Sequence, residues 1–407
     1  MYNKLALDLI EIFNHQGYLS IILDQSLKLI DEKDHKLYTK ILYGVVEKRD
    51  LIDYYLAPLI KGIRVKSYIK NILRIGAYSI TYLSLADHYI VNELVENVKK
   101  NDFRSSKFVN AVLRNYQRNP LPKLDNLNEI DKISIMLSLD KEITKLLYHQ
   151  YGTKLLDFYL DKEPFNTYRI NNLKINNDKM YQKLDELNID YEKINNGFIT
   201  KANLINSSFF IDGLIIMQDY ASMQVVDNLD IKKNDLILDA CSAPGGKSLY
   251  LASKYHDELN ITACDIYEKK LKKIKDNMDK LGIHNVNVFL ADATSYSYPI
   301  LYDVIICDAP CSGLGTINHK VDLKYHINLK DINEIKELQK KILNHLKQYV
   351  KQGGILQYST CTINQEENEE QIKAFLLENQ DYKMINEIKL YPSNNSDGFY
   401  ICKLQRK

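Results

Sequence analysis

Two cysteines in the C-terminal half of the chain have the chemistry needed for covalent attack on a nucleobase. Cys311 lies in the run D-A-P-C-S-G (308–313) and Cys361 lies in the run S-T-C-T (359–362), each directly after a predicted strand. A thiolate can add to C6 of cytosine and so make C5 reactive toward a sulfonium methyl group, so two cysteines at one strand edge indicate base methylation. Cys361 also precedes a predicted helix, whose N-terminus would lower the thiol pKa below about 8.5 and favour Cys361 as the nucleophile.

A glycine-rich loop between a predicted strand and a predicted helix indicates a cofactor site. The run L-I-L-D-A-C-S-A-P-G-G-K (236–247) is typical of the first βα unit of a doubly wound sheet, where ligands bind beyond the carboxyl ends of strands. Residues 246–248 resemble the end of a phosphate-binding loop, but that motif requires a glycine where this chain has Cys241. The dinucleotide fingerprint G-x-G-x-x-G is absent too, so the loop suits a cofactor that needs no phosphate cradle.

Three aspartates at predicted strand ends belong to the same edge. Asp265 lies 20 residues after Gly245, where such folds place an acid that accepts hydrogen bonds from ribose hydroxyls. Asp292 and Asp308 end the next two predicted strands, and Asp292 is placed to meet the amino group of an adenine. Alone, Asp292 is as well explained as a turn or helix-cap residue. Together, the three acids and the glycine loop favour a nucleoside cofactor such as S-adenosylmethionine.

The chain of 407 residues is long enough for two or three domains, and its charge is balanced. The formal net charge is +1 and the isoelectric point is about 7.6, so attraction to nucleic acid would have to come from local patches. Basic residues gather in two stretches of the N-terminal region, 61–74 and 104–118. On charge alone, a solvated helix face is the favoured explanation for both.

Several classes of protein are excluded by what the sequence lacks. No apolar run reaches the length of a membrane span, and residues 1–16 alternate charged and apolar residues at helical spacing, unlike a signal peptide. The six cysteines form no C-x-x-C pair, which argues against a zinc site and against a redox pair. We therefore expect a cytoplasmic protein with reduced cysteines, no metal and no membrane partner.

The hydrophobic pattern divides the chain into three parts. Residues 1–120 have apolar residues at spacings of three and four, which predicts an all-α helical bundle. The run N-P-L-P (119–122) marks a boundary. Residues 121–210 are expected to hold linker helices and a small α+β module, or simply the start of the catalytic domain. From residue 211 onward strands and helices alternate, which predicts an α/β Rossmann-like domain over 211–407.

The elements of the C-terminal part can be placed in more detail. Strands are expected at 236–240, 261–265, 286–291, 303–308 and 355–359, with a helix over 267–281. A second helix is expected over 331–350, ending at Gly353 and Gly354. The last helix is expected to begin directly after Cys361, because Thr362 and Gln365 fit a capping box.

Taken together, the motifs resemble those of a known enzyme class. D-A-C-S-A-P-G-G-K, D-A-P-C-S-G and S-T-C-T are similar to the motifs of the RNA cytosine-C5 methyltransferases of the Nol1/Nop2/Sun class, and Q-D-Y-A-S-M (218–223) also fits. The N-terminal region resembles the NusB-like domain that precedes the catalytic part in bacterial members, in the runs L-Y-G-V-V-E (42–47), I-L-R-I-G-A-Y (72–78), V-N-E-L-V-E (91–96) and F-V-N-A-V-L-R (108–114). The resemblance spans nearly the whole chain and is weakest over 120–165.

The resemblance implies distinct roles for the two cysteines and the cofactor loop. Cys361 would be the nucleophile, Cys311 would assist release of the methylated base, and Asp308 would act in catalysis. Lys247 would contact the target base or the carboxylate of the cofactor. S-adenosylmethionine would be bound by Cys241, Ser242, Ala243, Pro244, Gly245, Gly246, Lys247, Asp265, Asp292 and Asp308. DNA cytosine methyltransferases place the nucleophile in the P-C run instead, so chemistry alone leaves the choice between the two cysteines open.

The resemblance also implies a substrate. The expected partner is a cytosine in 16S rRNA, free or in a partly assembled small subunit, read in an exposed loop or flipped from its stack. The protein is expected to act as a monomer. Two alternatives stay open: the same reaction on tRNA, which the helical domain disfavours, and a non-catalytic RNA-binding or ribosome-assembly factor. The intact glycine loop and both cysteines argue against the second alternative.

Two departures from the class concern RNA recognition. After G-L-G-T the class usually has an arginine and then a proline before an acid, whereas this chain has I-N-H-K-V-D (317–322). One contact to the RNA backbone is therefore expected to be lost or moved to Lys320 or Lys324. The Pro-x-Trp expected around 139–143 is also missing, in a chain that has no tryptophan.

Overall fold

The computed structural model describes residues 1–83, 87–100, 102–160 and 165–407. Their contacts group the chain into two units. The first, named here the helical unit, comprises residues 1–160 and 320–329, and the second, the sheet unit, comprises residues 161–319 and 330–407. The domain boundaries expected at 120 and 210 stay a prediction, and the two units divide the chain at other places.

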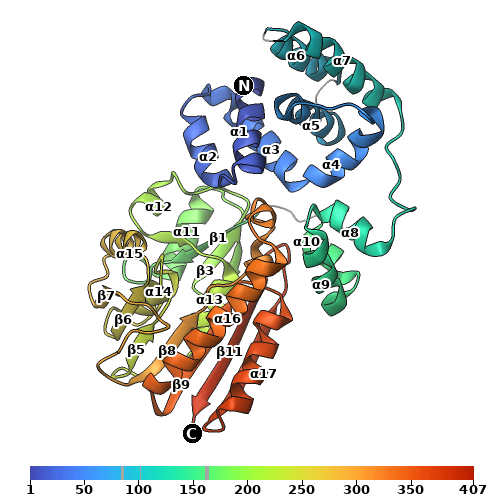
Figure 1. Ribbon diagram of the computed structural model, residues 1–407. Helices are drawn as coiled ribbons and strands as arrows, with labels where there is room; N and C mark the ends of the chain where they lie inside the picture. The colour runs from blue at the N-terminus through green and yellow to red at the C-terminus, as the bar shows by residue number, and fades with distance from the viewer. Residues whose placement is uncertain (84–86, 101, 161–164) are drawn as a thin grey trace. The chain divides into compact units, whose positions relative to one another are not determined.

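The helical unit begins with the helices that the apolar spacing predicted (Figure 1, blue to green). They are α1 (Tyr2–Asn14), α2 (Leu19–Leu27), α3 (Glu32–Glu47), α4 (Arg49–Leu56), α5 (Ser67–Tyr82), α6 (Asp87–Lys99) and α7 (Phe103–Arg118). Three more helices follow, α8 (Glu129–Leu137), α9 (Lys141–Tyr151) and α10 (Lys154–Tyr159). Because α8 packs against α4, and α9 and α10 pack against α8, these three helices extend the bundle.

Helix α5 is central in this unit, since it packs against α1, α3, α4, α6 and α7. Its apolar positions Ile69, Ile72 and Leu73 are buried, in agreement with their spacing. Helices α3 and α5 approach each other so closely that a Cβ on Gly44 would lie 2.0 Å from the ring of Tyr78. The packing therefore requires glycine at position 44.

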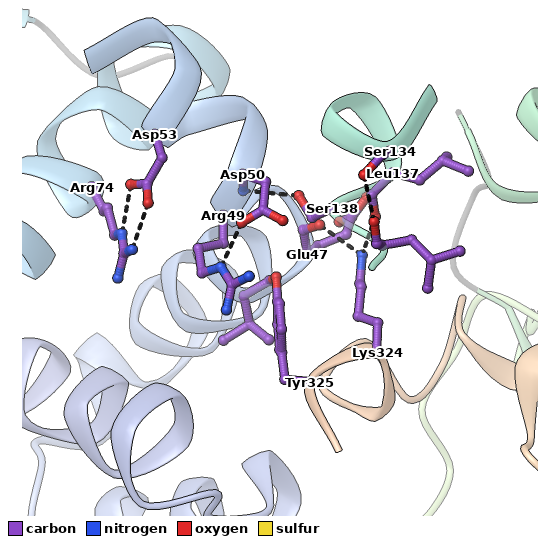
Figure 2. Close-up of polar contacts among 12 residues, drawn as sticks. Glu47, Arg49, Asp50, Asp53, Arg74, Ser134, Leu137, Ser138, Lys324 and Tyr325 are labelled. Atoms are coloured by element: carbon purple, nitrogen blue, oxygen red, sulfur yellow. Dashed lines mark hydrogen bonds and ion pairs between the residues drawn. The ribbon is translucent and has the colours of Figure 1, made fainter. Parts of the chain in front are cut away.

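Residues 320–329 belong to the helical unit although they lie far along the chain (Figure 2). They contain the turn η3 (Leu323–Tyr325), which brings Lys324 next to the ends of α3 and α8. Its Nζ donates to the carbonyls of Glu47 at 2.8 Å and Leu137 at 2.7 Å. Lys324 is only 5% exposed, so it is not available as the RNA contact that the sequence suggested.

The sheet unit begins with a small antiparallel sheet. Its strand order is β2 (Glu192–Ile194), β3 (Gly197–Thr200), β1 (Asn166–Ile170), β4 (Ile215–Met217), and α11 (Asn177–Glu186) packs on it through Met180 and Leu184. Arg169 of β1 is fully buried and donates to Gln218 Oε1 and to Ser253 Oγ, both at 2.7 Å. Because Ser253 lies in α14 (Gly246–Lys254), the small module is bonded to the first helix of the larger sheet.

A seven-stranded sheet forms the centre of this unit (Figure 1, yellow to red). Its order is β10 (Tyr382–Leu390), β11 (Phe399–Arg406), β9 (Val350–Thr360), β8 (Tyr302–Asp308), β5 (Leu236–Asp239), β6 (Asn260–Asp265), β7 (Val286–Leu290). Strands β9, β8, β5, β6 and β7 pair in parallel, whereas β11 and β10 are antiparallel. The predicted Rossmann-like α/β fold is confirmed. Strand β5 has β6 on one side and β8 on the other, so the topological switch point lies at β5.

Two hydrophobic clusters cover the two faces of this sheet. One contains side chains of α16 (Leu329–Leu346) and α17 (Glu369–Glu378), and the other contains side chains of α13 (Tyr220–Asp227), α14 and α15 (Glu268–Leu281). The central strands are apolar on both faces, as expected for parallel strands between two helix layers. This doubly wound arrangement leaves the carboxyl ends of the parallel strands as the edge at which ligands can bind.

The C-terminal elements differ from the expected ones in two places. Helix α16 ends at Leu346, a short turn follows, and Gly353 and Gly354 lie inside β9, so the prediction that these glycines end the helix is wrong. Gly353 has a φ of +78°, and the register of β8 against β9 shifts at this point, so the glycines form a bulge. The second difference is the antiparallel pair β10 and β11, for which the sequence analysis gave no strand.

Three further features bear on the class of protein. Among the described residues, no helix is long and apolar enough to cross a membrane. Within the same residues, no group of three or more His, Cys, Asp or Glu side chains is arranged to hold a metal ion. None of the six cysteines, all of which lie in the described part of the chain, forms a disulfide.

We predict that Gly44→Ala lowers the free energy of unfolding of the helical unit by about 1–3 kcal/mol, because the added methyl group must displace the Tyr78 ring. The control is Lys40→Ala at an exposed site in the same helix, which should change it by less than about 0.5 kcal/mol. Urea unfolding followed by circular dichroism measures both. Equal effects of the two substitutions would show that α3 and α5 do not need this close approach.

Candidate active site

The glycine loop is held by hydrogen bonds that start at the buried carboxylate of Asp239, the last residue of β5. Ser248 Oγ, in the first turn of α14, donates to Asp239 Oδ2 and lies 2.9 Å from Ser242 Oγ. The N–H of Ser242 donates to the carbonyl of Cys264 in β6 at 2.9 Å. Burial raises the pKa of Asp239 to about 6. The loop is thus bonded to two neighbouring strands and to the helix that follows it.

The end of this loop requires glycine. Gly245 has a φ of +96°, in the left-handed region, and is the N-cap of α14. A Cβ on Gly245 would lie 3.1 Å from Leu249 and 3.2 Å from Ile274, whereas one on Gly246 would meet nothing nearer than 3.5 Å. Helix α14 begins at the end of this loop, beyond the end of β5. The first backbone N–H groups of the helix have no partner within it and can bind polar groups of a ligand.

Two of the predicted acids follow the neighbouring strands. Asp265 ends β6 and is 6% exposed, and its Oδ1 accepts from the N–H of Tyr267 at 3.1 Å, which leaves Oδ2 for a ligand hydroxyl. Asp292 lies just beyond the end of β7. Its Oδ1 accepts from the hydroxyl and the N–H of Thr294, and these bonds lower the pKa of Asp292. Asp292 therefore forms a turn, and its role toward an adenine stays a prediction.

Lys247, in the first turn of α14, is paired with Asp308 at the end of β8. Its Nζ lies 2.5 Å from Asp308 Oδ2, and the other oxygen of this carboxylate accepts from Ser359 Oγ at 2.8 Å. Burial lowers the pKa of Lys247, but the Asp308 carboxylate and the nearby Cys361 outweigh this effect and the pKa is raised. Lys247 is therefore a cation at neutral pH, and it faces both the end of β8 and the end of β9.

The surroundings of Cys361 differ from the predicted ones. Helix α17 begins only at Glu369, so the prediction that a helix N-terminus directly follows Cys361 and lowers its pKa is wrong. Thr362 does not cap that helix, and its Oγ1 lies 2.8 Å from Ser312 Oγ instead. The ammonium group of Lys247 interacts electrostatically with Cys361. A cation at this place favours the thiolate over the thiol.

The two cysteines of the predicted site meet directly. Cys311 Sγ lies 3.3 Å from Cys361 Sγ, although the residues are 50 positions apart. The hydrogen bond between the thiols and the burial of Cys311 raise the pKa of Cys311 well above its usual value. Cys311 is therefore a thiol at neutral pH, whereas Cys361 faces the Lys247 cation. The two sulfurs lie side by side in different electrostatic surroundings.

One buried carboxylate, that of Glu367, holds the loops of both cysteines. Ser312, the residue after Cys311, donates to it through its N–H at 2.8 Å and through its hydroxyl at 2.5 Å. Asn364, in the loop after the second cysteine, donates through Nδ2 at 3.1 Å, and Gln339 of α16 donates at 3.2 Å. Burial raises the pKa of Glu367. The sequence analysis did not predict a role for this acid, because two of its hydrogen-bond donors, Ser312 and Gln339, come from distant parts of the chain.

Backbone atoms make a second connection between the two cysteine loops. The N–H of Gly315 donates to the carbonyl of Cys361 at 3.0 Å, and the N–H of Gly398 donates to the carbonyl of Gly315 at 2.8 Å. A Cβ on Gly315 would lie 2.1 Å from the carbonyl oxygen of Gly398. In β11 the ring of Phe399 lies 5.5 Å from Lys247 Nζ. Strand β11 therefore contributes to the site, and the sequence analysis missed it together with the strand.

A cluster of titratable groups beside these glycines is also absent from the predicted set. Asp219, the N-cap of α13, accepts from the N–H of Asp397 at 3.2 Å, and Asp397 Oδ1 lies 2.8 Å from His319 Nδ1. Burial and the Asp397 carboxylate raise the pKa of Asp219 to about 6. The hydrogen bond to Asp397 raises the pKa of His319. The only sequence signal for this cluster is the run Q-D-Y-A-S-M that contains Asp219.

The carboxyl edge of the sheet thus brings together a glycine loop, an ion pair of lysine and aspartate, and two thiols. The remaining loop residues of the predicted site, Cys241, Ala243 and Pro244, lie between β5 and α14. Cys264, Cys307 and Cys402 are buried apolar core residues. The arrangement can bind a nucleoside-type ligand at the loop and form a covalent bond to a second substrate through a thiolate.

Family models match both parts of the chain. The model described as 16S rRNA methyltransferase RsmB/F matches residues 226–405, which include the glycine loop and both cysteines of the site. The model of the NusB family matches residues 4–118.

Curated proteins and the solved structure of PH0851 match nearly the full chain. The probable ribosomal RNA small subunit methyltransferase B of Bacillus subtilis (strain 168) is 30% identical over 98% of this chain and 97% of its own. The ribosomal RNA small subunit methyltransferase B of Shewanella oneidensis is 31% identical over 95% of this chain and 94% of its own. The crystal structure of the protein PH0851 covers 100% of this chain and 99% of that chain, with a TM-score of 0.81 and 23% identity, which supports the fold alone.

We predict that Glu367→Gln lowers the free energy of unfolding of the sheet unit by about 1–3 kcal/mol, because the amide nitrogen of glutamine would face donors that now share a carboxylate. The matched control is Glu366→Gln, which neutralises the neighbouring acid in a partly exposed ion pair and should cost less than about 1 kcal/mol. Denaturant unfolding measures both variants. If Glu367→Gln were as stable as Glu366→Gln, the carboxylate of Glu367 would not be what holds the two loops.

Proposed function

The chain belongs to the ribosomal RNA small subunit methyltransferase B family, and on this premise we propose that it transfers a methyl group from S-adenosylmethionine to C5 of a cytosine in 16S rRNA. The observation that carries the proposal is the pair of cysteine sulfurs, 3.3 Å apart, beside the ion pair of Lys247 and Asp308. A nitrogen or oxygen acceptor has a lone pair of its own and needs no thiol. C5 of cytosine gains its reactivity only when a nucleophile adds to C6.

The residues of the glycine loop fit S-adenosylmethionine. The backbone at Gly246 is approachable, since an added Cβ would meet nothing nearer than 3.5 Å, and Asp265 has an oxygen left for ribose hydroxyls. We assign to this site Cys241, Ser242, Ala243, Pro244, Gly245, Gly246, Lys247, Asp265, Asp292 and Asp308. When bound, the cofactor supplies a methyl group on a positively charged sulfur.

Cys361 is the nucleophile in this proposal. Lys247 stabilises the Cys361 thiolate, and Asp308 holds Lys247 in place. The thiolate adds to C6 of the cytosine, which forms a C6–S bond and moves electron density to C5. C5 then takes up the methyl group. A water molecule takes the proton from C5, the electron pair of the C5–H bond forms the C5–C6 double bond again, and the C6–S bond breaks to restore the thiolate.

Cys311 assists the release of the methylated base. Its sulfur lies 3.3 Å from the sulfur of Cys361, so it can donate a hydrogen bond to the leaving thiolate. Because Cys311 is a thiol at neutral pH, it does not compete for C6 of the base. The hydrogen bonds to Glu367 maintain the separation of the two sulfurs.

The proposed substrate rests on the family and on the helical unit. Relatives that match nearly the full chain are named as methyltransferases of small-subunit ribosomal RNA, and the NusB model matches residues 4–118. We infer that the helical unit binds RNA and that the partner is 16S rRNA, free or in a partly assembled subunit, in the cytoplasm. With a net charge of +1, RNA affinity should be modest and should decrease with salt, with a slope set by the few basic patches.

We predict opposite outcomes for the two cysteine variants. Cys361→Ala should abolish methyl transfer, because no thiolate is left to activate the ring. Cys311→Ala should form the covalent protein–RNA complex and accumulate it, because release is impaired. Transfer of labelled methyl groups to unmodified 16S rRNA, and denaturing gels for the complex, measure the two effects.

The control for these variants is Cys402→Ala, which removes a buried thiol from the core and should leave 5-methylcytosine formation intact. Full activity of Cys361→Ala would overturn the assignment of the nucleophile. Unmodified 23S rRNA and bulk tRNA are tested in parallel, and label in tRNA alone would keep the chemistry and overturn the substrate. Failure to bind S-adenosylmethionine would instead favour a non-catalytic RNA-binding protein.

We predict that Asp265→Asn weakens S-adenosylmethionine binding about tenfold or more, because a charged acceptor for the ribose hydroxyls is replaced by a neutral amide. Isothermal titration with the cofactor measures the dissociation constant without RNA. Glu268→Gln, an exposed acid in the next helix, is the matched control and should bind as the wild type does. Unchanged affinity of Asp265→Asn would remove Asp265 from the site.

A further inference from the structure

The segment 320–329, named here the anchor segment, is held by the helical unit through an unusual use of one lysine (Figure 2). Lys324 Nζ donates to the carbonyl of Glu47, the last residue of α3, and to that of Leu137, the last residue of α8. The carboxyl end of a helix carries a partial negative charge and carbonyls without partners in the helix. One ammonium group therefore caps two helices at once.

The aromatic residue after this lysine is held just as closely. The hydroxyl of Tyr325 donates to the carbonyl of Val46 at 2.6 Å. The guanidinium carbon of Arg49 lies 4.0 Å from the centre of the Tyr325 ring, and Phe13 meets the same ring edge-on at 5.3 Å. A hydrogen bond, a cation over the ring and an aromatic contact thus fix Tyr325 in the helical unit.

Residues on either side of this pair bind the same helices. Asp322 Oδ2 accepts from the N–H of Leu19 at 2.8 Å, at the start of α2. The ring of His326 stacks on that of Tyr18 at 4.6 Å. Val321 is buried in the hydrophobic core of the helical unit. The anchor segment is therefore part of that core and does not lie loosely upon it.

The anchor segment continues directly from the loop that carries Cys311. In the sheet unit, the N–H of Gly315 donates to the carbonyl of Cys361, and His319 Nδ1 lies 2.8 Å from Asp397. Only Lys320 and Val321 separate His319 from Asp322, the first side chain of the segment that bonds to the helical unit. A displacement of the anchor segment would therefore pull on a loop that ends at the reactive thiols.

We propose that the anchor segment is the element through which the helical unit holds the Cys311 loop in its reactive arrangement, and that Lys324 and Tyr325 are positioning residues for methyl transfer. Neither residue touches the thiols, and both act through the chain that joins them to Cys311. The role assigned to the NusB-like part is thereby extended, since it supports the site in addition to binding RNA.

The energetics of Lys324 support a specific role. Burial lowers its pKa to about 8, against the opposing effects of nearby Glu47 and Asp50. Placing an ammonium group in such surroundings costs free energy unless its protons are all well bonded. An apolar side chain could hold the segment in the core without this desolvation cost. A lysine that must donate to the carboxyl ends of two helices does so in only one position of the segment. The arrangement thus gives up stability and gains a defined geometry.

The functional part of this proposal rests on the proposed role of Cys311, and the structural part does not. The test therefore has two independent measurements on the full chain. Hydrogen exchange followed by mass spectrometry reports protection of residues 311–329, and steady-state kinetics with 16S rRNA reports kcat and KM. A wild-type protein that transfers no methyl group would defeat the proposed function and leave the exchange result standing.

In Lys324→Met, which keeps the length of the side chain and removes its donors, exchange in the anchor segment should accelerate about tenfold or more. The value of kcat should fall about tenfold or more, since small misplacements of reactive groups have effects of that size. The KM for S-adenosylmethionine should not change, because the glycine loop is not connected to the segment. Lys330→Met, an exposed lysine just after the segment, should match the wild type in all three respects.

Tyr325→Phe is a second test variant that should not impair folding, because it removes only the hydroxyl and keeps the ring between Arg49 and Phe13. It should show the same pattern as Lys324→Met to a smaller degree. Faster exchange with unchanged kcat would overturn the positioning role. Unchanged exchange in both variants would overturn the anchor itself.

Discussion

The carboxylate of Glu367 is the interaction on which the arrangement of the site depends. It accepts hydrogen bonds from the loop after Cys311, the loop after Cys361 and α16, and so joins a helix to the two loops that follow the paired strands β8 and β9. With its charge buried, this acid is stable only while its donors stay in place. The 3.3 Å separation of the two sulfurs is thus maintained by a group that takes no part in the chemistry.

Two lysines have different surroundings and different proposed roles in the reaction. Lys247 is paired with the carboxylate of Asp308, and its charge lies where a thiolate must form. Lys324 is surrounded by helix-end carbonyls, and its charge organises the segment that follows the other thiol. Lys247 stabilises the negative charge of the Cys361 thiolate, whereas Lys324 fixes the position of the segment that follows the Cys311 loop. The glycine-rich motif indicates a role at the site for Lys247, whereas no local pattern predicts the burial of Lys324 against two helix ends.

The elements that position the site could largely be predicted from the sequence, because parallel strands place their carboxyl ends at one edge. The loop after β5, Asp265, Asp308 and the two cysteines all follow apolar runs, which is a local signal. The contacts of Glu367, the strand β11 with Phe399, and the anchor segment could not be predicted, since each depends on residues distant in the chain. The prediction of a helix directly after Cys361 was wrong for the same reason. Thr362 bonds to Ser312, which is distant in the chain, and α17 begins only at Glu369.

The central claim is that Cys361 attacks C6 of a cytosine in 16S rRNA. The most direct test uses 16S rRNA in which cytidine is replaced by 5-fluorocytidine, since fluorine at C5 cannot leave as a proton does and the adduct is trapped. After incubation with S-adenosylmethionine and digestion with nuclease and trypsin, mass spectrometry identifies the modified peptide. We predict a single nucleotide attached to the peptide that contains Cys361, and only with the cofactor present. Attachment to the peptide that contains Cys311, or no attachment while normal rRNA is methylated, would contradict the claim.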